Sequence, residues 1–416
     1  MTPPKPPKPP KPRPLLHDHN ARLYLTVVIV SGFGTSALWL ASGVWVKDLT
    51  GSNSLAALCM LAMWTPTLAG PALGTLADRS RRKPLLIAAN LLLATLLLTL
   101  TTVDAPADLW LLFTVLFVYG ATGIVHDAAE SALVATAVDH TVLGDFNGLR
   151  MSATEGMKLL APLAGAGLYA TYGGPAVAAL DAATFLIAVG LYIRLRVQEP
   201  RPDRRPTLTW RAQTTEGARH LWRHPRLRPL VLAGGTTMLF AGLNGALIYA
   251  VVDALGHAPA YTGVLYAVQG AGSLTAGLLS GPALRRFGER RFAAYGIALT
   301  AVAAGLRAIP ADPLALACSA AIGLGLPCVL VTVLTAVQRD TPPTLLGRTV
   351  ATANTLVFAP NVLGLAAGAA LIEPLGLRPL LPILGAAWLA TALPLLHNPA
   401  SADRTASRSA SDANPA

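Results

Sequence analysis

The chain alternates between long apolar stretches and short clusters of charged residues. A helix of about 20 residues is long enough to cross the roughly 30 Å hydrocarbon core of a bilayer. The pattern therefore predicts an all-α membrane protein with twelve transmembrane helices. The predicted spans are residues 23–46, 55–76, 85–103, 109–134, 149–172 and 175–195, then 229–252, 261–284, 292–306, 314–337, 349–372 and 377–396.

Polar segments flank and divide these spans. We expect six-helix halves at 23–195 and 229–396, joined by a cytoplasmic connector at 196–228. Disordered cytoplasmic tails are expected at 1–22 and 397–416. The first tail is basic and carries a Pro-Pro-Lys repeat, which favours an extended polyproline helix and cannot form the apolar core of a signal peptide.

Composition and charge agree with a membrane protein. Only 13% of the residues are charged, against about 25% in a typical soluble domain. With the N-terminus in the cytoplasm, 28 of the 32 Lys and Arg residues lie on the cytoplasmic side, and only Lys47, Arg307 and Arg378 lie outside. This asymmetry predicts a multi-pass protein of the inner membrane with both termini cytoplasmic. It also explains the net charge of +11 without a nucleic-acid partner.

The two halves share an internal repeat. Arg150, Ala153, Thr154 and the pair at 161–162 recur at a constant offset of 198 residues, as Arg348 and the residues that follow it. Duplicated halves of this kind place a substrate site between them near the bilayer midplane and expose it alternately to each side.

The loop between spans two and three carries a family resemblance. Residues 74–83, Gly-Thr-Leu-Ala-Asp-Arg-Ser-Arg-Arg-Lys, resemble the signature G-x-L-A-D-R-x-G-R-K of the major facilitator superfamily, with Arg81 in place of the second glycine. The degenerate copy after span eight has Arg285 where the signature has Asp. Residues 216–226 and 338–348 resemble the branch that includes macrolide-efflux and siderophore-exporting proteins. The resemblance implies a transporter with two pseudo-symmetric six-helix halves.

The same resemblance implies a cytoplasmic latch. Asp78 is expected near the start of span eleven, where exposed helix N–H groups favour a carboxylate. Arg82 is expected to pair with a carboxylate at the end of span four and so to hold the inward gate closed; the alternative is that these are ordinary loop charges. The predicted gating residues are Gly74, Asp78, Arg79, Arg82, Asp127 and Glu130.

Charged residues inside the spans are candidates for energy coupling, because burying them is costly. Glu155 and Lys158 lie three residues apart on one helical face. In one interpretation, Glu155 is a proton-titrating carboxylate whose proton affinity is tuned by the ammonium group of Lys158. In the other, the two residues form an ion pair that only orients the helix. Asp181 is a further candidate, although its surroundings favour a structural role. No acid or base is expected well inside the spans of the second half, so coupling is assigned to the first half.

Uncharged polar residues are the candidates for the second half of the site. Gln269 and Asn354, with Asn244 and Asn361, could line the substrate cavity or bond across helices. His220 and His224 are spaced i, i+4 but lack a third ligand, and the three cysteines lie in apolar runs. We therefore expect no metal and no cofactor. The absence of a nucleotide-binding loop or a nucleophile arrangement argues against an enzyme or an ATP-driven pump.

Together these features predict a secondary active transporter. The leading hypothesis is a monomeric, proton-coupled exporter of small amphipathic organic compounds, such as drugs, antibiotics or siderophore-like molecules. Its partners would be that substrate, protons and the lipid bilayer. The alternatives are an importer or facilitator on the same fold, or a non-transporting sensor or lipid-handling membrane protein.

Overall fold

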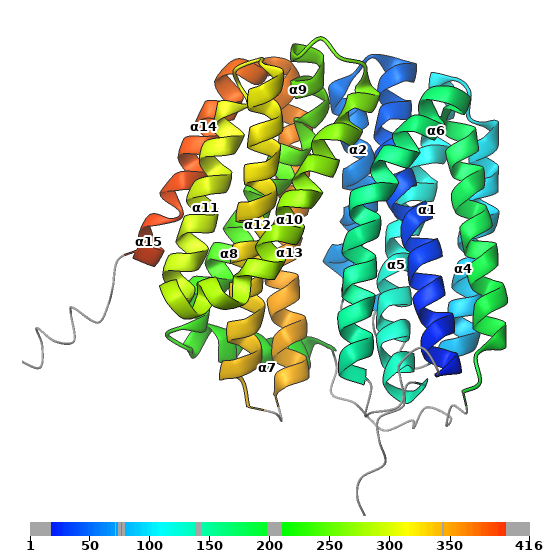
Figure 1. Ribbon diagram of the computed structural model, residues 1–416, viewed down its shortest axis with the longest axis horizontal. Coiled ribbons are helices and arrows are strands. Elements are labelled where there is room, and N and C mark those ends of the chain that lie inside the picture. The colour runs from blue at the N-terminus through cyan, green and yellow to red at the C-terminus, as the bar shows by residue number, and fades with distance from the viewer. Residues whose placement is uncertain are drawn as a thin grey trace, which may run out of the picture.

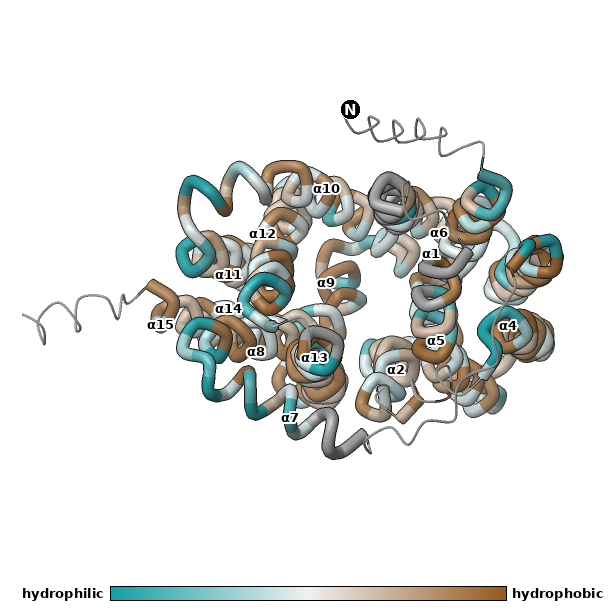
Figure 2. The backbone as a smooth tube through the Cα atoms, turned by 90° about the horizontal axis from the view of Figure 1, so that it is seen from below, coloured by the Kyte–Doolittle hydropathy of each residue, from teal (hydrophilic) through white to brown (hydrophobic). Residues whose placement is uncertain are grey.

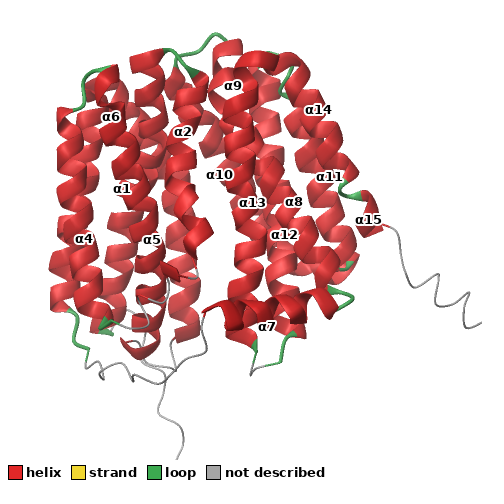
Figure 3. Cartoon of the chain, turned by 180° about the vertical axis from the view of Figure 1, so that it is seen from behind, coloured by secondary structure: helices red, strands yellow, loops and turns green. Residues whose placement is uncertain are grey.

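The computed structural model describes residues 18–70, 72–73, 76, 80–137, 143–197, 210–342 and 345–396. These residues are helical, with connecting loops and no strand among them (Figure 3). The α-helices are α1 (His19–Thr50), α2 (Asn53–Trp64), α4 (Arg82–Thr99), α5 (Leu109–Ala137), α6 (Leu143–Arg194), α7 (Trp210–Arg223), α8 (Leu227–Ala246), α9 (Ile248–Ala254), α10 (Thr262–Phe287), α11 (Glu289–Leu306), α12 (Asp312–Asp340), α13 (Leu346–Leu375), α14 (Leu377–Ala390) and α15 (Leu393–Leu396). Short 3₁₀ turns connect them: η2 (Thr65–Ala69), η3 (Leu100–Thr102), η4 (Pro106–Asp108) and η5 (Pro259–Tyr261).

The predicted spans fall on these helices. Seven helices of the described chain are long and apolar enough to cross a membrane, and an eighth span results if α8 and α9, bent by 43°, are taken together. α6 contains predicted spans five and six, because the chain turns at Gly173 (φ 76°, ψ −178°), a backbone conformation that glycine adopts without steric cost. α11 begins at Glu289, earlier than predicted.

The helices form two bundles side by side (Figures 1 and 2). In the first, α1 packs along α6, and α2, α4 and α5 complete the bundle around buried residues such as Leu38, Leu97 and Leu112. In the second, α8 packs along α13, and α11 and α12 pack on each other around Val333 and Trp388. Glycines permit the closest approaches: a Cβ at residue 364 of α13 would collide with the carbonyl oxygen of residue 239 in α8.

Hydrogen bonds join the two bundles at one end only, among the residues described. Asp253 at the end of α9 accepts from Lys47 Nζ (2.6 Å) and from Asn53 Nδ2 (3.0 Å). Ser52 Oγ donates to Glu373 (2.9 Å), and Ser54 Oγ donates to a backbone carbonyl of α13 (2.7 Å). We call this the closed end.

The opposite end carries α7, which lies across the base of the second bundle (Figures 1 and 3) and is largely hydrophilic (Figure 2). It is held to α13 by an ion pair between Glu216 and Arg348. Gly217 lies so close to Thr352 that a side chain there would collide with it. We call this the α7 end.

Candidate functional site: a cavity between the two bundles

A cavity of about 350 Å³ lies between the two bundles. Its wall combines α1 and α2 of the first bundle with α8, α9, α10, α12, α13 and α14 of the second. Arg307, the residue directly after α11, also lines it. The lining residues are Trp39, Met60, Trp64, Met238, Ala241, Gly242, Asn244, Gly245, Ile248, Tyr266, Gln269, Arg307, Ile322, Leu326, Asn361, Leu365 and Trp388.

Four aromatic side chains form part of an otherwise mostly aliphatic wall. Trp39 and Tyr266 meet edge to face across the two bundles, with ring centroids 4.8 Å apart. Trp64 stacks on Phe358 of the second bundle at 6.4 Å. Trp388 is fully buried, and its indole N–H has no hydrogen-bond partner. Broad aromatic faces of this kind bind the flat or apolar part of a small organic molecule.

A few amides give the cavity its polar contacts. Gln269, a predicted cavity residue, is among the lining residues, as are Asn244 and Asn361. The Oδ1 atom of Asn244 is buried without a hydrogen-bond partner, so it is an acceptor that a ligand could satisfy. Asn354 is exposed on α13 and is not part of the cavity lining.

Arg307 is the charged residue of the cavity lining. It follows α11 directly, in the connection to α12 where the sequence places an outer loop. What the sequence does not predict is its burial: it is only 3% exposed and lines the cavity. Its Nη2 donates to Ser319 Oγ of α12 (2.7 Å), and its buried Nε has no partner. The neighbouring Leu306 and Ile309 are exposed, whereas the Arg307 side chain is directed inward to Ser319 of α12.

Asp181 lies in the first bundle and does not line the cavity. It is fully buried and accepts hydrogen bonds from Tyr119 Oη (3.0 Å) and Thr184 Oγ1 (3.1 Å). Tyr119 in turn bonds to Thr35 of α1 (2.8 Å). A Cβ at Gly34 would collide with the Asp181 carboxylate. This network ties α1, α5 and α6 together, and a role of Asp181 in proton coupling stays a prediction.

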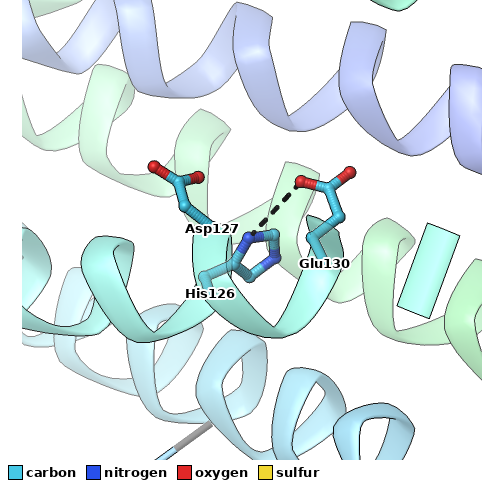
Figure 4. Close-up of side chains that lie close together, drawn as sticks. All are labelled: His126, Asp127 and Glu130. Carbon is cyan, nitrogen blue, oxygen red and sulfur yellow. Dashed lines mark ion pairs between the residues drawn. The ribbon is translucent and has the colours of Figure 1, made fainter. Parts of the chain in front are cut away.

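Glu130 belongs to a polar cluster on α5 with His126 and Asp127 (Figure 4). Its Oε2 lies 3.7 Å from Arg150 Nη1 and 3.9 Å from His126 Nδ1. His126 Nε2 lies 3.4 Å from Tyr192 Oη of α6, and Asp127 is exposed. The sequence does not identify Arg150 as a partner of Glu130, and the expected pairing of Arg82 with a carboxylate of this cluster stays a prediction. Its repeat counterpart Arg348 pairs with Glu216, so each half uses the equivalent arginine in an ion pair.

This cluster has the residue types of a metal site. One ligand atom each of His126, Asp127 and Glu130 lies within 4.8 Å of the others. The Arg150 guanidinium already supplies positive charge next to Glu130, and a cation there repels a divalent ion. The arrangement therefore favours an ion-pair network over a metal site.

Several predicted residues lie outside what the structure describes. These are Gly74, Asp78 and Arg79 of the signature loop and the side chains of Glu155 and Lys158 within α6. Arg82 is the first residue of α4, and Lys83 donates to the backbone carbonyls of residues 193 and 195 (3.0 and 2.9 Å). The latch and the coupling pair stay predictions.

The sequence and the fold of this chain are similar to those of known proteins. The family model described as Major Facilitator Superfamily matches residues 24–251 and 230–414. The chain belongs to this superfamily, and it is a multi-pass membrane transporter, not an enzyme. The predicted family is thereby confirmed.

Relatives of known name are distant. Macrolide efflux protein A of Streptococcus pyogenes is 25% identical over 263 residues, which are 61% of this chain and 64% of that protein. Macrolide efflux protein A of Enterococcus faecalis is 25% identical over 241 residues, covering 56% of this chain and 73% of that protein. The chain thus matches less than two thirds of the streptococcal protein.

Solved structures confirm the fold. A peptide transporter, POT, superimposes with a TM-score of 0.73 at 15% identity over 95% of this chain and 96% of that one. The nucleoside transporter NupG gives 0.71 at 14% identity over 91% and 98%. The D-xylose-proton symporter gives 0.67 at 16% identity over 90% and 97%. The chain therefore has the all-helical major facilitator fold, as predicted. The family model, which matches nearly the whole chain, makes it a secondary transporter of that superfamily.

Arg307 and Arg150 are the functional candidates that sequence reasoning missed. One signal was available for Arg307: it is the only charged residue between Arg291 and Asp312. An isolated cation in so apolar a stretch, on the side of the membrane where cations are scarce, is a candidate for burial. Nothing in the local sequence of Arg150 indicates its partner.

Proposed function

We propose that this protein is a proton-coupled exporter of small amphipathic organic compounds. The observation that carries the proposal is the aromatic cavity of about 350 Å³ between the two bundles. Ligand pockets in proteins have about 300–1,000 Å³ and combine apolar walls with a few polar groups, as this one does. The similarity to macrolide efflux proteins favours export over import.

The proposed orientation places the α7 end in the cytoplasm, as the distribution of Lys and Arg predicts. In that orientation the bonds around Asp253 close the outer side, which supports our assignment of an inward-facing state. Transport would follow when these bonds break and the bundles rock about the cavity. A reporter fused to the C-terminus checks the orientation: a reporter active in the cytoplasm should work there, and activity of a periplasmic reporter would contradict it.

For proton coupling we propose Glu155, with Lys158 as its modulator. The backbone of α6 supports this choice, because Leu159 lies against Gly270 of α10, next to the cavity residue Gln269. This part of α6 therefore lies at the boundary between the bundles. A carboxylate there can release its proton when the bundles separate and water enters.

Reconstitution into liposomes tests the function. An imposed pH gradient should drive an amphipathic dye uphill, in the direction opposite to the proton flow. Transport of the dye in the same direction as the protons would indicate an importer, and downhill movement that the gradient does not affect would indicate a facilitator. No movement of the dye would indicate a non-transporting protein. Each of these results would contradict the proposal. The amount of dye transported is compared with that in liposomes that contain no protein.

Variants test the coupling residue separately. Glu155→Gln should abolish uphill transport and keep downhill exchange. The matched control is Asp104→Asn, which also neutralises a carboxylate, at an exposed position of the described chain outside the junction, and should keep coupling. Full proton-driven transport by the double variant Glu155→Gln, Lys158→Met would show that the pair only orients the helix.

A further inference from the structure

Arg307 is buried in the cavity without a counter-charge. Its side chain is only 3% exposed. No carboxylate of the described chain forms an ion pair with it, and none is among the residues that line the cavity. Arginine stays protonated in proteins, so the cavity contains a permanent positive charge.

The arginine is held in place but not satisfied. Ser319 Oγ accepts from Nη2 at 2.7 Å and itself donates to the backbone carbonyl of residue 315 (2.9 Å). This bond fixes the plane of the guanidinium group. The Nε–H, buried and without a partner, remains available as a donor. A buried cation with an unused N–H is unfavourable unless a further group compensates it.

We propose that Arg307 binds an anionic group of the substrate, a carboxylate, and that the transported compounds are amphipathic organic anions. The aromatic wall formed by Trp39, Trp64 and Trp388 holds the apolar body of the same molecule. The guanidinium fork matches the two oxygens of a carboxylate. This inference rests on the proposed function and names the substrate class of that site.

The other charge classes fit the cavity less well. A protonated amine would lie within a few ångströms of an unscreened like charge, and the lining offers it no acid. A neutral compound would occupy the aromatic wall and leave the cation uncompensated. The amides of Asn244 and Gln269 can hydrogen-bond to either class, so they do not decide the preference.

Binding of three matched probes tests the inference without any variant. Naphthylacetate, naphthylacetamide and naphthylethylamine share one apolar body and differ in charge. Quenching of the cavity tryptophans by each probe gives its affinity for the purified protein in detergent. Naphthylacetate should bind about 10- to 100-fold more tightly than the amide, as expected for one charged hydrogen-bonded contact, and the amine should bind most weakly. Equal affinities, tighter binding of the amine, or no binding of naphthylacetate would overturn the proposal.

Variants then assign the preference to one residue. Arg307→Gln should reduce naphthylacetate affinity to that of the amide and leave amide binding unchanged. Arg307→Lys, which keeps the charge and loses the fork, should give an intermediate affinity and provides the answer if the glutamine variant fails to fold. Arg378→Gln is the matched control, because Arg378 is exposed at the same end of the second bundle; it should keep the preference. An anion preference that persists in both Arg307 variants would overturn the assignment.

The two proposals can fail separately. Proton-driven transport of a neutral or cationic dye with no preference for anionic probes would overturn only the substrate class. Selective binding of naphthylacetate without proton-driven movement of any probe would overturn only the exporter proposal.

Discussion

The closed end offers a test of the conformational cycle, through the charge of Asp253. This carboxylate lies 2.6 Å from Lys47 Nζ and 3.0 Å from Asn53 Nδ2, both in the first bundle. Asp253→Asn keeps an acceptor for Asn53 and removes the ion pair with Lys47. We expect the substitution to shift the protein away from the inward-facing state.

The size of the shift follows from burial. The Lys47 side chain is 10% exposed and that of Asp253 is 39% exposed. Fully exposed ion pairs contribute roughly 0.2–1 kcal/mol, and hydrogen bonds to charged groups contribute about 1.5–3 kcal/mol. A half-screened pair lies between these ranges, at about 1–2 kcal/mol, which corresponds to a roughly 5- to 30-fold change in the ratio of the two states.

Spin labels at the closed end measure this ratio. Cysteines replacing Ala107 in η4 and Ile309 after α11 carry the labels, because both residues are exposed and belong to different bundles. The three native cysteines are first replaced. Double electron–electron resonance measures the distance between the two labels. The population with the longer distance should be larger in Asp253→Asn than in the protein with native Asp253.

A matched control isolates the contact between the bundles. Asp312 at the start of α12 lies 2.8 Å from His257 Nε2, within the second bundle. Asp312→Asn removes a comparable charge without touching the junction and should leave the distances unchanged. If the two variants give the same distance distribution, the Lys47–Asp253 pair does not stabilise the inward-facing state.

Three further predictions concern the first half. Asp78→Asn and Arg82→Ala should each lower transport several-fold with normal amounts of protein in the membrane, because the latch no longer biases the conformers; near-normal transport rates in both would remove the gating role. Glu155→Gln should lose the pH dependence of exchange measured in liposomes, since no proton can be taken up at that site, and an unchanged pH profile would move coupling to another acid. Asp181→Ala should lower the melting temperature measured in detergent, because it removes the buried hydrogen bonds from Tyr119 and Thr184, each of which contributes about 0.5–1.5 kcal/mol; an unchanged melting temperature would contradict the structural role.

The predicted fold was obtained from features that are local in the sequence. Crossing a bilayer requires an apolar run of fixed length, so the spans are visible without knowing how they pack. Their ends were less accurate: α1 extends from His19 to Thr50, beyond the predicted limits, because a helix continues past the hydrocarbon core. The boundary between predicted spans five and six shows a similar limit. Gly173 and Pro175 mark the turn between these two spans, but the sequence does not tell how few residues separate the two helices within α6.

The candidate site was predictable only in part. Gln269 was identified because an amide within an apolar span is conspicuous. Asn354 has the same signal and lies on an exposed face, because the sequence does not specify the rotation of a helix that is apolar nearly all round. The partners of Glu130 could not be predicted for a related reason: Arg150 approaches it only when α6 packs against α5.

The sequence by itself determined the membrane class, the order of the spans, the duplicated halves and the family, because hydropathy, charge clusters and motifs are properties of contiguous residues. Only the tertiary structure decided which polar groups meet. Asp181 meets Tyr119, 62 positions away, and Lys47 meets Asp253 across 206. Arg307 follows the end of its helix, where sequence alone indicated a loop, and packing placed its charge inside the cavity. The helices must bury their apolar faces against each other first, and that packing determines where each charge lies.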